Sequence, residues 1–439
     1  MSHLEREVLR RVLSGEFGPR EAEQAAEHLV SCERCRAQAG TLLDELRAAN
    51  PKLEGKGSLR MVFEIIDRER QWGVESLAAL AEWAELRKLT RHGQRDRVRL
   101  TKACHTMPFF HLALGELKEE TSWEEAEFLA GLALLSAEAM SQRRLISQPS
   151  HHDLQAEVWT AVANARRRAA EWERAHRALA HAERHLREGT GEPRLEAGLL
   201  SITASTVGEE GHESRALAAL ERCRAIYEVL SEWALVARTL VKTANILVET
   251  DPASSLVALD RAAPLIPAED STLILLAELL RVRNLIELQR PAEALSVYRR
   301  CSRLLIANPR VRLRLRGRFT GAQLLDALGF KPQAERLFNE VVGGDIEHEL
   351  YKDAFLDLLY LYGRHMRAGE LEKAARVCRR ALTDPSLSEI AHEQLRTLWS
   401  QLLEAAQHRA IGEDVLSEIR RYLCVHWKRP AGRPPVVRA

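Results

Sequence analysis

The chain has few aromatic residues and almost no net charge. Phe, Trp and Tyr make up 5% of its 439 residues, and 64 Lys and Arg against 63 Asp and Glu give a formal net charge of +1. This balance provides no global field that would attract nucleic acid or an anionic membrane. Hydrophobic residues reach 46%, which is ample for the core of a chain longer than one ordinary domain. The abundance of Ala, Leu, Glu and Arg favours helix over sheet.

Targeting and membrane signals are also lacking. The sequence has no run of about 18 apolar residues that could span a membrane, and its first six residues, MSHLER, lack the apolar centre of a signal peptide. We therefore expect a cytoplasmic protein. Seven cysteines are too few and too scattered for a disulfide framework. The isolated ones are expected to be buried as small hydrophobic residues: Cys104, Cys223, Cys301, Cys378 and Cys424.

Common catalytic motifs are missing as well. The sequence contains no phosphate-binding glycine loop, no His-Glu-x-x-His and no Gly-x-Ser-x-Gly. We therefore expect a protein without enzymatic activity. His151-His152-Asp153 could contribute to a metal site, but the pattern favours a helix start with Ser150 as its cap and Asp153 completing a capping box.

Four potential metal ligands lie within the first 35 residues. His28, Cys32 and Cys35 are spaced as H-x3-C-x2-C, and His3 precedes them. Zinc in structural sites favours four such ligands in a tetrahedron. Ser31 can cap a helix that carries both cysteines on its first turn, where the helix dipole is expected to lower the pKa of the thiols. Two alternatives remain open: the cysteines merely pack, or their oxidation ejects zinc in a redox switch.

The spacing His3-x24-His28-x3-Cys32-x2-Cys35 resembles the zinc-binding anti-sigma domain, a helical module at the N-terminus of many bacterial anti-sigma factors. The resemblance covers about residues 1–49 and implies Zn2+ held by these four residues, with a sigma factor as candidate partner. Many members of that family have a transmembrane helix after the module, which this sequence lacks. The family also grips its sigma factor with a fourth helix; Met61–Trp72 could serve, or could begin the next domain.

Residues beyond a polar, helix-breaking linker at 50–58 contain an internal repeat. Small residues recur 39 to 41 positions apart, each followed four residues later by a bulkier residue and three residues after that by another small one. Residues with these offsets share one helix face, and small ones allow close helix packing. Proline precedes three copies, as in the first turn of a helix. The six small residues that open the copies are Ala175, Ala216, Ser255, Ala294, Ala334 and Ala374.

This pattern is similar to the tetratricopeptide repeat, whose second helix carries Ala, an aromatic residue and Ala at these offsets. The usual period is about 34 residues, so longer helices or turns are expected here. The resemblance implies an α-solenoid of helix hairpins over residues 59–424. The last hairpin is expected to pair Ile390–Ala405 with Val415–Leu423, and a flexible basic tail is expected at 425–439.

A basic stretch opens the first helix of one repeat. Its arginines alternate with apolar residues as in a strand, but the repeat context predicts a helix, on which Arg310, Arg314 and Arg318 share a face. First helices line the concave groove of such a superhelix. These three arginines are therefore candidate partner-binding residues for an acidic peptide or a phosphorylated group. The alternatives are a solvated face paired with acidic neighbours and a nucleic-acid surface, which the lack of interleaved aromatic residues disfavours.

The sequence therefore predicts an all-α, non-enzymatic regulator that binds protein partners. A small helical zinc module occupies 1–49, a linker 50–58, a tetratricopeptide-like solenoid 59–424 and a tail 425–439. The zinc module would engage a sigma factor, and the solenoid would act as sensor or scaffold. The alternatives are a pure interaction scaffold with a structural zinc module, and a thiol redox switch through Cys32 and Cys35.

Overall fold

The predicted all-α fold is confirmed. A computed structural model describes residues 3–14, 24–26, 28–29, 32–49, 58–120, 122–408 and 413–423, and all regular structure in these ranges is helical. None of the helices in these ranges is long and apolar enough to cross a membrane. Ser31, most of the predicted linker, Cys424 and the predicted tail lie outside the described residues.

The chain divides into two compact units. The first comprises Met1–Glu116 and Gly131–Leu145, and the second comprises Leu117–Ala130 and Ile146–Ala439. Helix α7 (Trp123–Gln142) contributes to both. Ser122 caps its start, because the Ser122 hydroxyl accepts a hydrogen bond from the backbone N–H of Glu125 at 3.4 Å.

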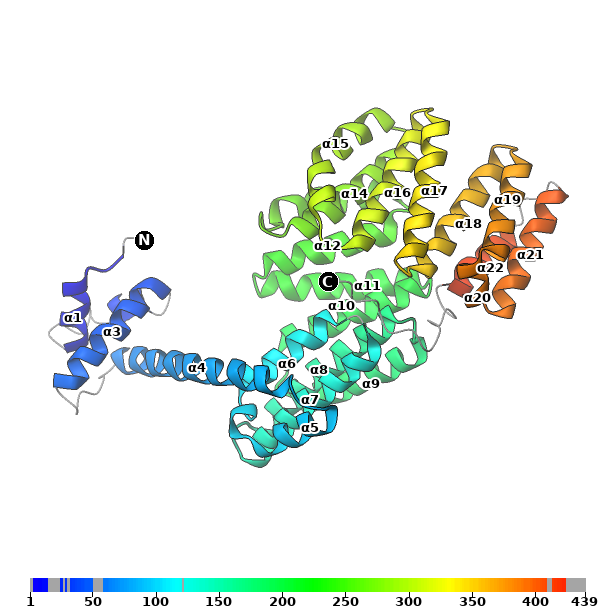
Figure 1. Cartoon of the computed structure of the whole chain (residues 1–439). Helices are drawn as coiled ribbons and strands as arrows, with labels where there is room; N and C mark the ends of the chain where they lie inside the picture. Colours follow the sequence, from blue (N-terminus) through cyan, green and yellow to red (C-terminus); the bar gives the residue numbers. More distant parts are fainter. Residues whose placement is uncertain are drawn as a thin grey trace. The chain divides into compact units, whose positions relative to one another are not determined.

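The other helices of the first unit are α1 (Arg6–Ser14), α3 (Glu33–Ala49), α4 (Ser58–Leu86), α5 (Arg91–Leu100), η1 (Lys102–Cys104) and α6 (Met107–Glu119), of which the end from Leu117 onward belongs to the second unit (Figure 1). Its N-terminal core forms where the apolar face of α1 meets α3 and the start of α4. Leu9 and Leu43 are fully buried there, and Ile66 is 2% exposed. This core lies beneath the candidate metal ligands, because Cys35 belongs to the same buried cluster.

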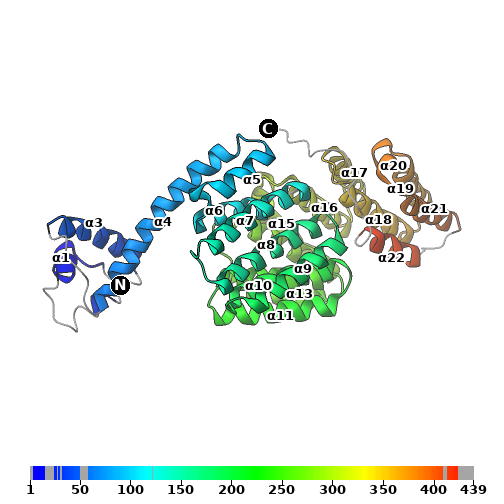
Figure 2. The same cartoon turned by 90° about the horizontal axis from the view of Figure 1, so that it is seen from below.

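The second unit is a series of helix pairs that follow one another along the chain (Figures 1 and 2). Within each pair, the first helix packs against the second. Successive pairs also contact each other, for example through the first helices α8 and α10 or α14 and α16. The pairs are α8 (Gln148–Arg168) with α9 (Trp172–Glu188), α10 (Pro193–Glu209) with α11 (Glu213–Val229), α12 (Trp233–Leu247) with α13 (Pro252–Ala262), α14 (Ser271–Glu287) with α15 (Pro291–Ala307), α16 (Val311–Ala327) with α17 (Lys331–Glu347), and α18 (Tyr351–Arg367) with α19 (Leu371–Thr383). A short η2 (Ala263–Leu265) follows α13.

The repeat register read from the sequence is confirmed. All six small residues that open the copies lie on the second helix of a pair, and each is 0% exposed. The one serine among them, Ser255, is buried with its hydroxyl satisfied: it donates to the carbonyl of Ala244 at 2.8 Å and accepts from Asn284 at 2.7 Å. A polar residue is tolerated in this core because both of its hydrogen-bonding functions are used.

Four of the isolated cysteines lie among the described residues, and all four are buried as predicted: Cys104, Cys223, Cys301 and Cys378. Burial raises the pKa of the Cys104 and Cys378 thiols to about 12. Both thiols are therefore protonated and unreactive at neutral pH.

Two predicted helix boundaries are wrong. Helix α8 is capped by Ser147, whose hydroxyl accepts from the N–H of Ser150 at 3.2 Å, so the helix starts earlier than a Ser150 cap would allow. Pro149 in its first turn explains the earlier start. Asp153 completes no capping box; its carboxylate accepts from the N–H of Thr190 at 3.0 Å and from its hydroxyl at 2.6 Å.

The second wrong boundary is the start of the predicted terminal hairpin, because Ile390 ends one helix instead of beginning the next. Asp384 caps a separate short helix, α20 (Pro385–Ile390), because Pro385 cannot continue α19. The next helices are α21 (Glu393–Gln407) and α22 (Glu413–Arg421). Helix α22 packs against α18 as well as α21, so α22 turns back onto the preceding pair.

Candidate functional site

The four predicted metal ligands meet at one point in the first unit. His3 precedes α1, His28 lies in a short helical segment, Cys32 immediately precedes α3, and Cys35 lies in its first turn. His28 Nε2 is 3.3 Å from Cys35 Sγ, and His3 Nδ1 is 3.4 Å from Cys32 Sγ and 3.5 Å from Cys35 Sγ. One donor atom from each of the four lies within 4.8 Å of all the others.

These separations fit a tetrahedral metal ion. With Zn–N distances of about 2.0–2.1 Å and Zn–S of about 2.3 Å, the edges of a tetrahedron are about 3.4–3.8 Å long. The observed contacts of 3.3 to 3.5 Å are close to that range. Two imidazoles and two thiols are also the donor types that zinc prefers. The residues present could therefore hold Zn2+ with only small movements.

Backbone contacts hold the ligands in place. The N–H of Cys32 donates to the carbonyl of His28 at 2.9 Å, and the N–H of Leu4 points to Cys35 Sγ at 3.4 Å. The prediction of lowered thiol pKa values holds for one cysteine only. A backbone hydrogen bond from Cys35 lowers the pKa of Cys32, whereas burial raises the pKa of Cys35. The prediction is wrong for Cys35 because burial raises the pKa of its thiol more than the start of the helix lowers it.

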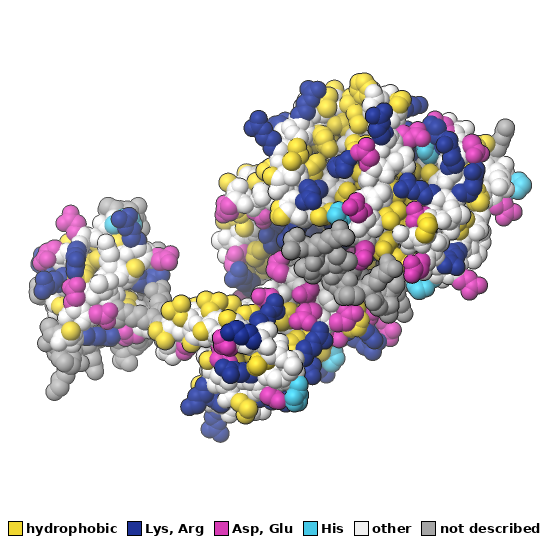
Figure 3. Space-filling view, viewed as in Figure 1, with side chains coloured by type: hydrophobic (Ala, Val, Ile, Leu, Met, Phe, Trp, Pro, Cys, Tyr) yellow, Lys and Arg dark blue, Asp and Glu magenta, His cyan; other side chains and the backbone are white. Residues whose placement is uncertain are grey.

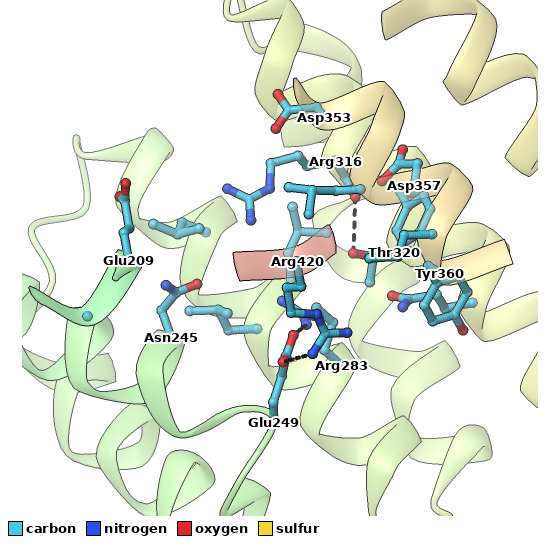
Figure 4. A pocket seen from close by; sticks show the side chains of 18 of the residues that line it. Glu209, Asn245, Glu249, Arg283, Arg316, Thr320, Asp353, Asp357, Tyr360 and Arg420 are labelled. Atoms are coloured by element: carbon cyan, nitrogen blue, oxygen red, sulfur yellow. Dashed lines mark hydrogen bonds and ion pairs between the residues drawn. The ribbon is translucent and has the colours of Figure 1, made fainter. Parts of the chain in front are cut away.

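A second candidate site is a pocket of about 770 Å³ in the second unit. Its lining comes mainly from the first helices of consecutive pairs, α10, α12, α14, α16 and α18, and from α22 (Figure 4). First helices thus line the hollow in the way the repeat pattern predicts. Asn245 of α12 and Thr320 of α16 add uncharged hydrogen-bonding groups to it.

Arginines from three helices reach this pocket. Arg283 comes from α14, Arg316 from α16 and Arg420 from α22. Arg283 and Arg420 both pair with Glu249, at 3.6 and 3.2 Å. Among these three, only Arg316 has no ion pair within 4.0 Å to a described acidic residue. Its guanidinium is therefore the best placed to meet a negatively charged group in the pocket.

The pocket also has acidic residues in its lining, and two of them lie near Arg316. Asp345 of α17 is 2% exposed, and its Oδ2 has no hydrogen-bond partner among the described residues. Burial, opposed in part by Asp357, raises the pKa of Asp345 to about 7. Burial and the nearby Asp345 carboxylate raise the pKa of Asp357 well above its ordinary value. Because these two carboxyl groups interact with each other, the pair retains a proton at pH values where an exposed aspartate is ionised.

The predicted partner-binding arginines lie elsewhere. Arg310 is 3.6 Å from Glu119, Arg314 donates to the carbonyl of Asn308 at 2.7 Å, and Arg318 pairs with Glu340 at 2.5 Å. None of these three lines the pocket, and their role in partner binding stays a prediction. Sequence reasoning passed over Arg316, although Leu313, Arg316 and Thr320 have the i, i+3, i+7 spacing of a single helix face.

No family model matches this chain, and no curated protein matches it. The anti-sigma resemblance therefore rests on the four ligand positions alone. Among solved structures, the chain is similar to the crystal structure of a Rap protein complexed with Competence and Sporulation Factor. The match covers 72% of this chain and 94% of that one, with 14% sequence identity and a TM-score of 0.52. At this identity the likeness concerns the fold: the chain is a helical-repeat protein of the tetratricopeptide-like kind.

Proposed function

We propose that this chain is a non-enzymatic regulator that binds protein partners, and that the pocket of the second unit receives a peptide segment of the partner. The observation that carries this proposal is the pocket itself, whose lining combines Arg316 with the Asp345–Asp357 pair. Its volume of about 770 Å³ lies within the range of about 300–1,000 Å³ that is typical of ligand pockets. The Rap protein complexed with Competence and Sporulation Factor has the same kind of fold, which supports a binding role.

The charges suggest the chemistry of the segment. A carboxylate or a phosphorylated side chain would pair with Arg316, because guanidinium binds both in a bidentate manner. An ammonium or guanidinium group of the same segment would favour ionisation of Asp345 and Asp357. A segment with charges of both signs therefore fits better than the purely acidic peptide that the arginine stretch suggested.

An affinity capture with matched variants tests this proposal. Full-length wild-type protein, Arg316→Glu and Arg318→Glu would each be used as bait in an extract of the native organism. Partners that occupy the pocket should be retained by the wild type and by Arg318→Glu but lost with Arg316→Glu. Equal capture by all three baits would show that partners bind outside the pocket.

For the first unit, the proposal is a zinc module in which His3, His28, Cys32 and Cys35 hold one Zn2+. Four protein ligands would close the coordination sphere, as in structural zinc sites. The metal would then stabilise the fold of the module and supply no open position for catalysis.

We propose that the whole protein, as a regulator of this kind, acts in the cytoplasm.

A second candidate function for this unit is binding of a sigma factor, and one observation favours it. Helix α4 follows the module and includes the predicted segment Met61–Trp72, but it extends to Leu86. Beyond that segment it exposes an apolar stripe at i, i+3 and i+6: Val74 is 69% exposed, Leu77 72% and Leu80 52%. Hydrophobic side chains gather along this helix in Figure 3. An exposed apolar stripe of this kind suits a helix-binding partner.

Titration against the sigma factor encoded nearest the gene tests this second function. We expect full-length protein to bind it with a Kd below about 10 μM, or about −7 kcal/mol. The double variant Val74→Glu, Leu77→Glu should lose this affinity, whereas Glu75→Gln, on the same helix, should retain it. Absence of binding by the wild type would favour the scaffold alternative.

A further inference from the structure

A second group of potential metal ligands lies at one end of the α8–α9 pair. His152 lies near the start of α8, and His185 and Glu188 lie near the end of α9. His152 Nδ1 is 3.1 Å from His185 Nδ1 and 3.4 Å from a carboxylate oxygen of Glu188. The two imidazoles are stacked, with ring centroids 5.4 Å apart. One donor atom from each residue lies within 4.8 Å of the other two.

We propose that His152, His185 and Glu188 form a second metal site, selective for a divalent transition ion such as Zn2+. With metal–nitrogen and metal–oxygen distances of about 2.0–2.2 Å, tetrahedral edges are about 3.3–3.5 Å long. The two measured separations are 3.1 and 3.4 Å, so an ion would require only a small shift. Imidazole donors favour Zn2+, Ni2+ or Cu2+ over Mg2+ and Ca2+, which bind oxygen.

The backbone fixes the three donors relative to one another. His185 and Glu188 are three residues apart, so both project from the same face of α9. Two hydrogen bonds from Thr190 to Asp153, the residue after His152, fasten the end of α9 to the start of α8. Gly189 permits this approach, since a Cβ at that position would overlap the Asp153 carboxylate. Ligands held on two packed helices are pre-organised, which reduces the entropic cost of binding an ion.

The site is accessible and has an open coordination position. His152 and His185 are half-buried, and the side chain of Glu188 is 53% exposed. Three protein ligands leave the fourth position for water or for a donor from a partner. The alternative explanation is a hydrogen bond between two neutral imidazoles, in which one Nδ1–H donates to the other Nδ1. That contact would hold the rings together without an ion, so only metal binding can distinguish the two.

Metal stoichiometry of the full-length protein tests the proposal. Metal-free protein would be titrated with Co2+ and then with Zn2+, with bound metal measured by elemental analysis after dialysis. The wild type should bind two ions. The variant Cys32→Ser, Cys35→Ser should retain one, and its cobalt complex should show ligand-field absorption without the thiolate charge-transfer band. The variant His152→Gln, His185→Gln should also retain one ion, with that band intact.

Two further variants guard against loss by misfolding. Glu188→Gln changes an exposed ligand and should weaken the second ion at least tenfold, because even indirect partners of metal ligands contribute about 10- to 100-fold. His176→Gln, on the same helix but paired with Glu210 at 2.9 Å, should still bind two ions. The proposal is overturned if the cysteine variant binds no ion, or if the double histidine variant binds as many ions as the wild type. One ion in both the wild type and the cysteine variant would contradict the N-terminal site instead.

Discussion

Arg420 donates to the carboxylate of Glu249 at 3.2 Å, although the two residues are 171 positions apart in the chain. This contact brings α22 to the end of α12, on the wall of the pocket in the second unit. Arg283 pairs with the same carboxylate. Helix α22 thus takes part in the candidate binding site, and substitutions in it can alter binding as well as stability.

Replacement of Cys32 by Ser should abolish zinc binding at the N-terminal site. Structural zinc contributes directly to folding, so chelation of the wild type should unfold residues 1–49 and leave the repeats helical. Circular dichroism before and after chelation should show a small loss of helix, and hydrogen exchange should locate it in the module. A Cys223→Ser variant is the control, since that thiol is buried in the repeats. Full zinc retention by Cys32→Ser would contradict the ligand assignment.

Replacement of Ala334 by Leu should destabilise the repeats by about 1–3 kcal/mol through overpacking. Ala334 is 0% exposed, so a larger side chain has no room without displacing its neighbours. The matched control is Ala292→Leu, an exposed position on another second helix, where the change should be within about 0.5 kcal/mol. Chemical denaturation measures both. Equal tolerance at the two positions would contradict the repeat register.

The Asp345–Asp357 pair should make stability depend on pH. The pKa of Asp345 is about 7 in the folded protein against 3.8 ordinarily, so the folded state binds more protons in this interval. Stability must then fall as pH rises from about 4 to about 7. Asp345→Asn removes the charge, so we expect the variant to be more stable than wild type at about pH 8.

The same comparison at about pH 4 is the internal control. There the wild-type carboxyl groups are mostly protonated, and the advantage of Asp345→Asn should disappear. Asp260→Asn changes an exposed aspartate, 66% accessible at its side chain, and should show no such pH-dependent gain. Thermal unfolding at both pH values measures the effect. The prediction is contradicted if Asp345→Asn is less stable than wild type at about pH 8. That result would mean that Arg312 and Arg316 stabilise the ionised Asp345 carboxylate of the wild type.

The sequence predicted the parts of this structure that depend on local patterns. The six small residues gave the repeat register, because residues at i, i+4 and i+7 must share a helix face. The spacing of the histidines and cysteines predicted four metal ligands whose donor atoms lie close together in the structure: His3, His28, Cys32 and Cys35. Ser147 was missed as the cap of α8 because Ser150 has the same chemistry three residues later, and only the Pro149 between them distinguishes the two.

The pocket could not be predicted in the same way. Its charged lining combines Arg283, Arg316 and Arg420 with Asp345, residues from four helices whose proximity depends on how successive pairs stack. Arg420 is the extreme case, since it belongs to a helix outside the repeat register. His152 and His185 show the same limit, because their contact requires the pairing of α8 with α9.

The most direct test of the central claim is a titration of the captured partner against three full-length proteins. Calorimetry would compare wild type with Arg316→Glu, inside the pocket, and Arg318→Glu, two residues away and paired with Glu340. We predict that Arg316→Glu weakens binding at least about tenfold, or about 1.4 kcal/mol, and that Arg318→Glu leaves it nearly unchanged. Loss of binding with Arg318→Glu and not with Arg316→Glu would contradict the pocket and favour the face formed by Arg310, Arg314 and Arg318.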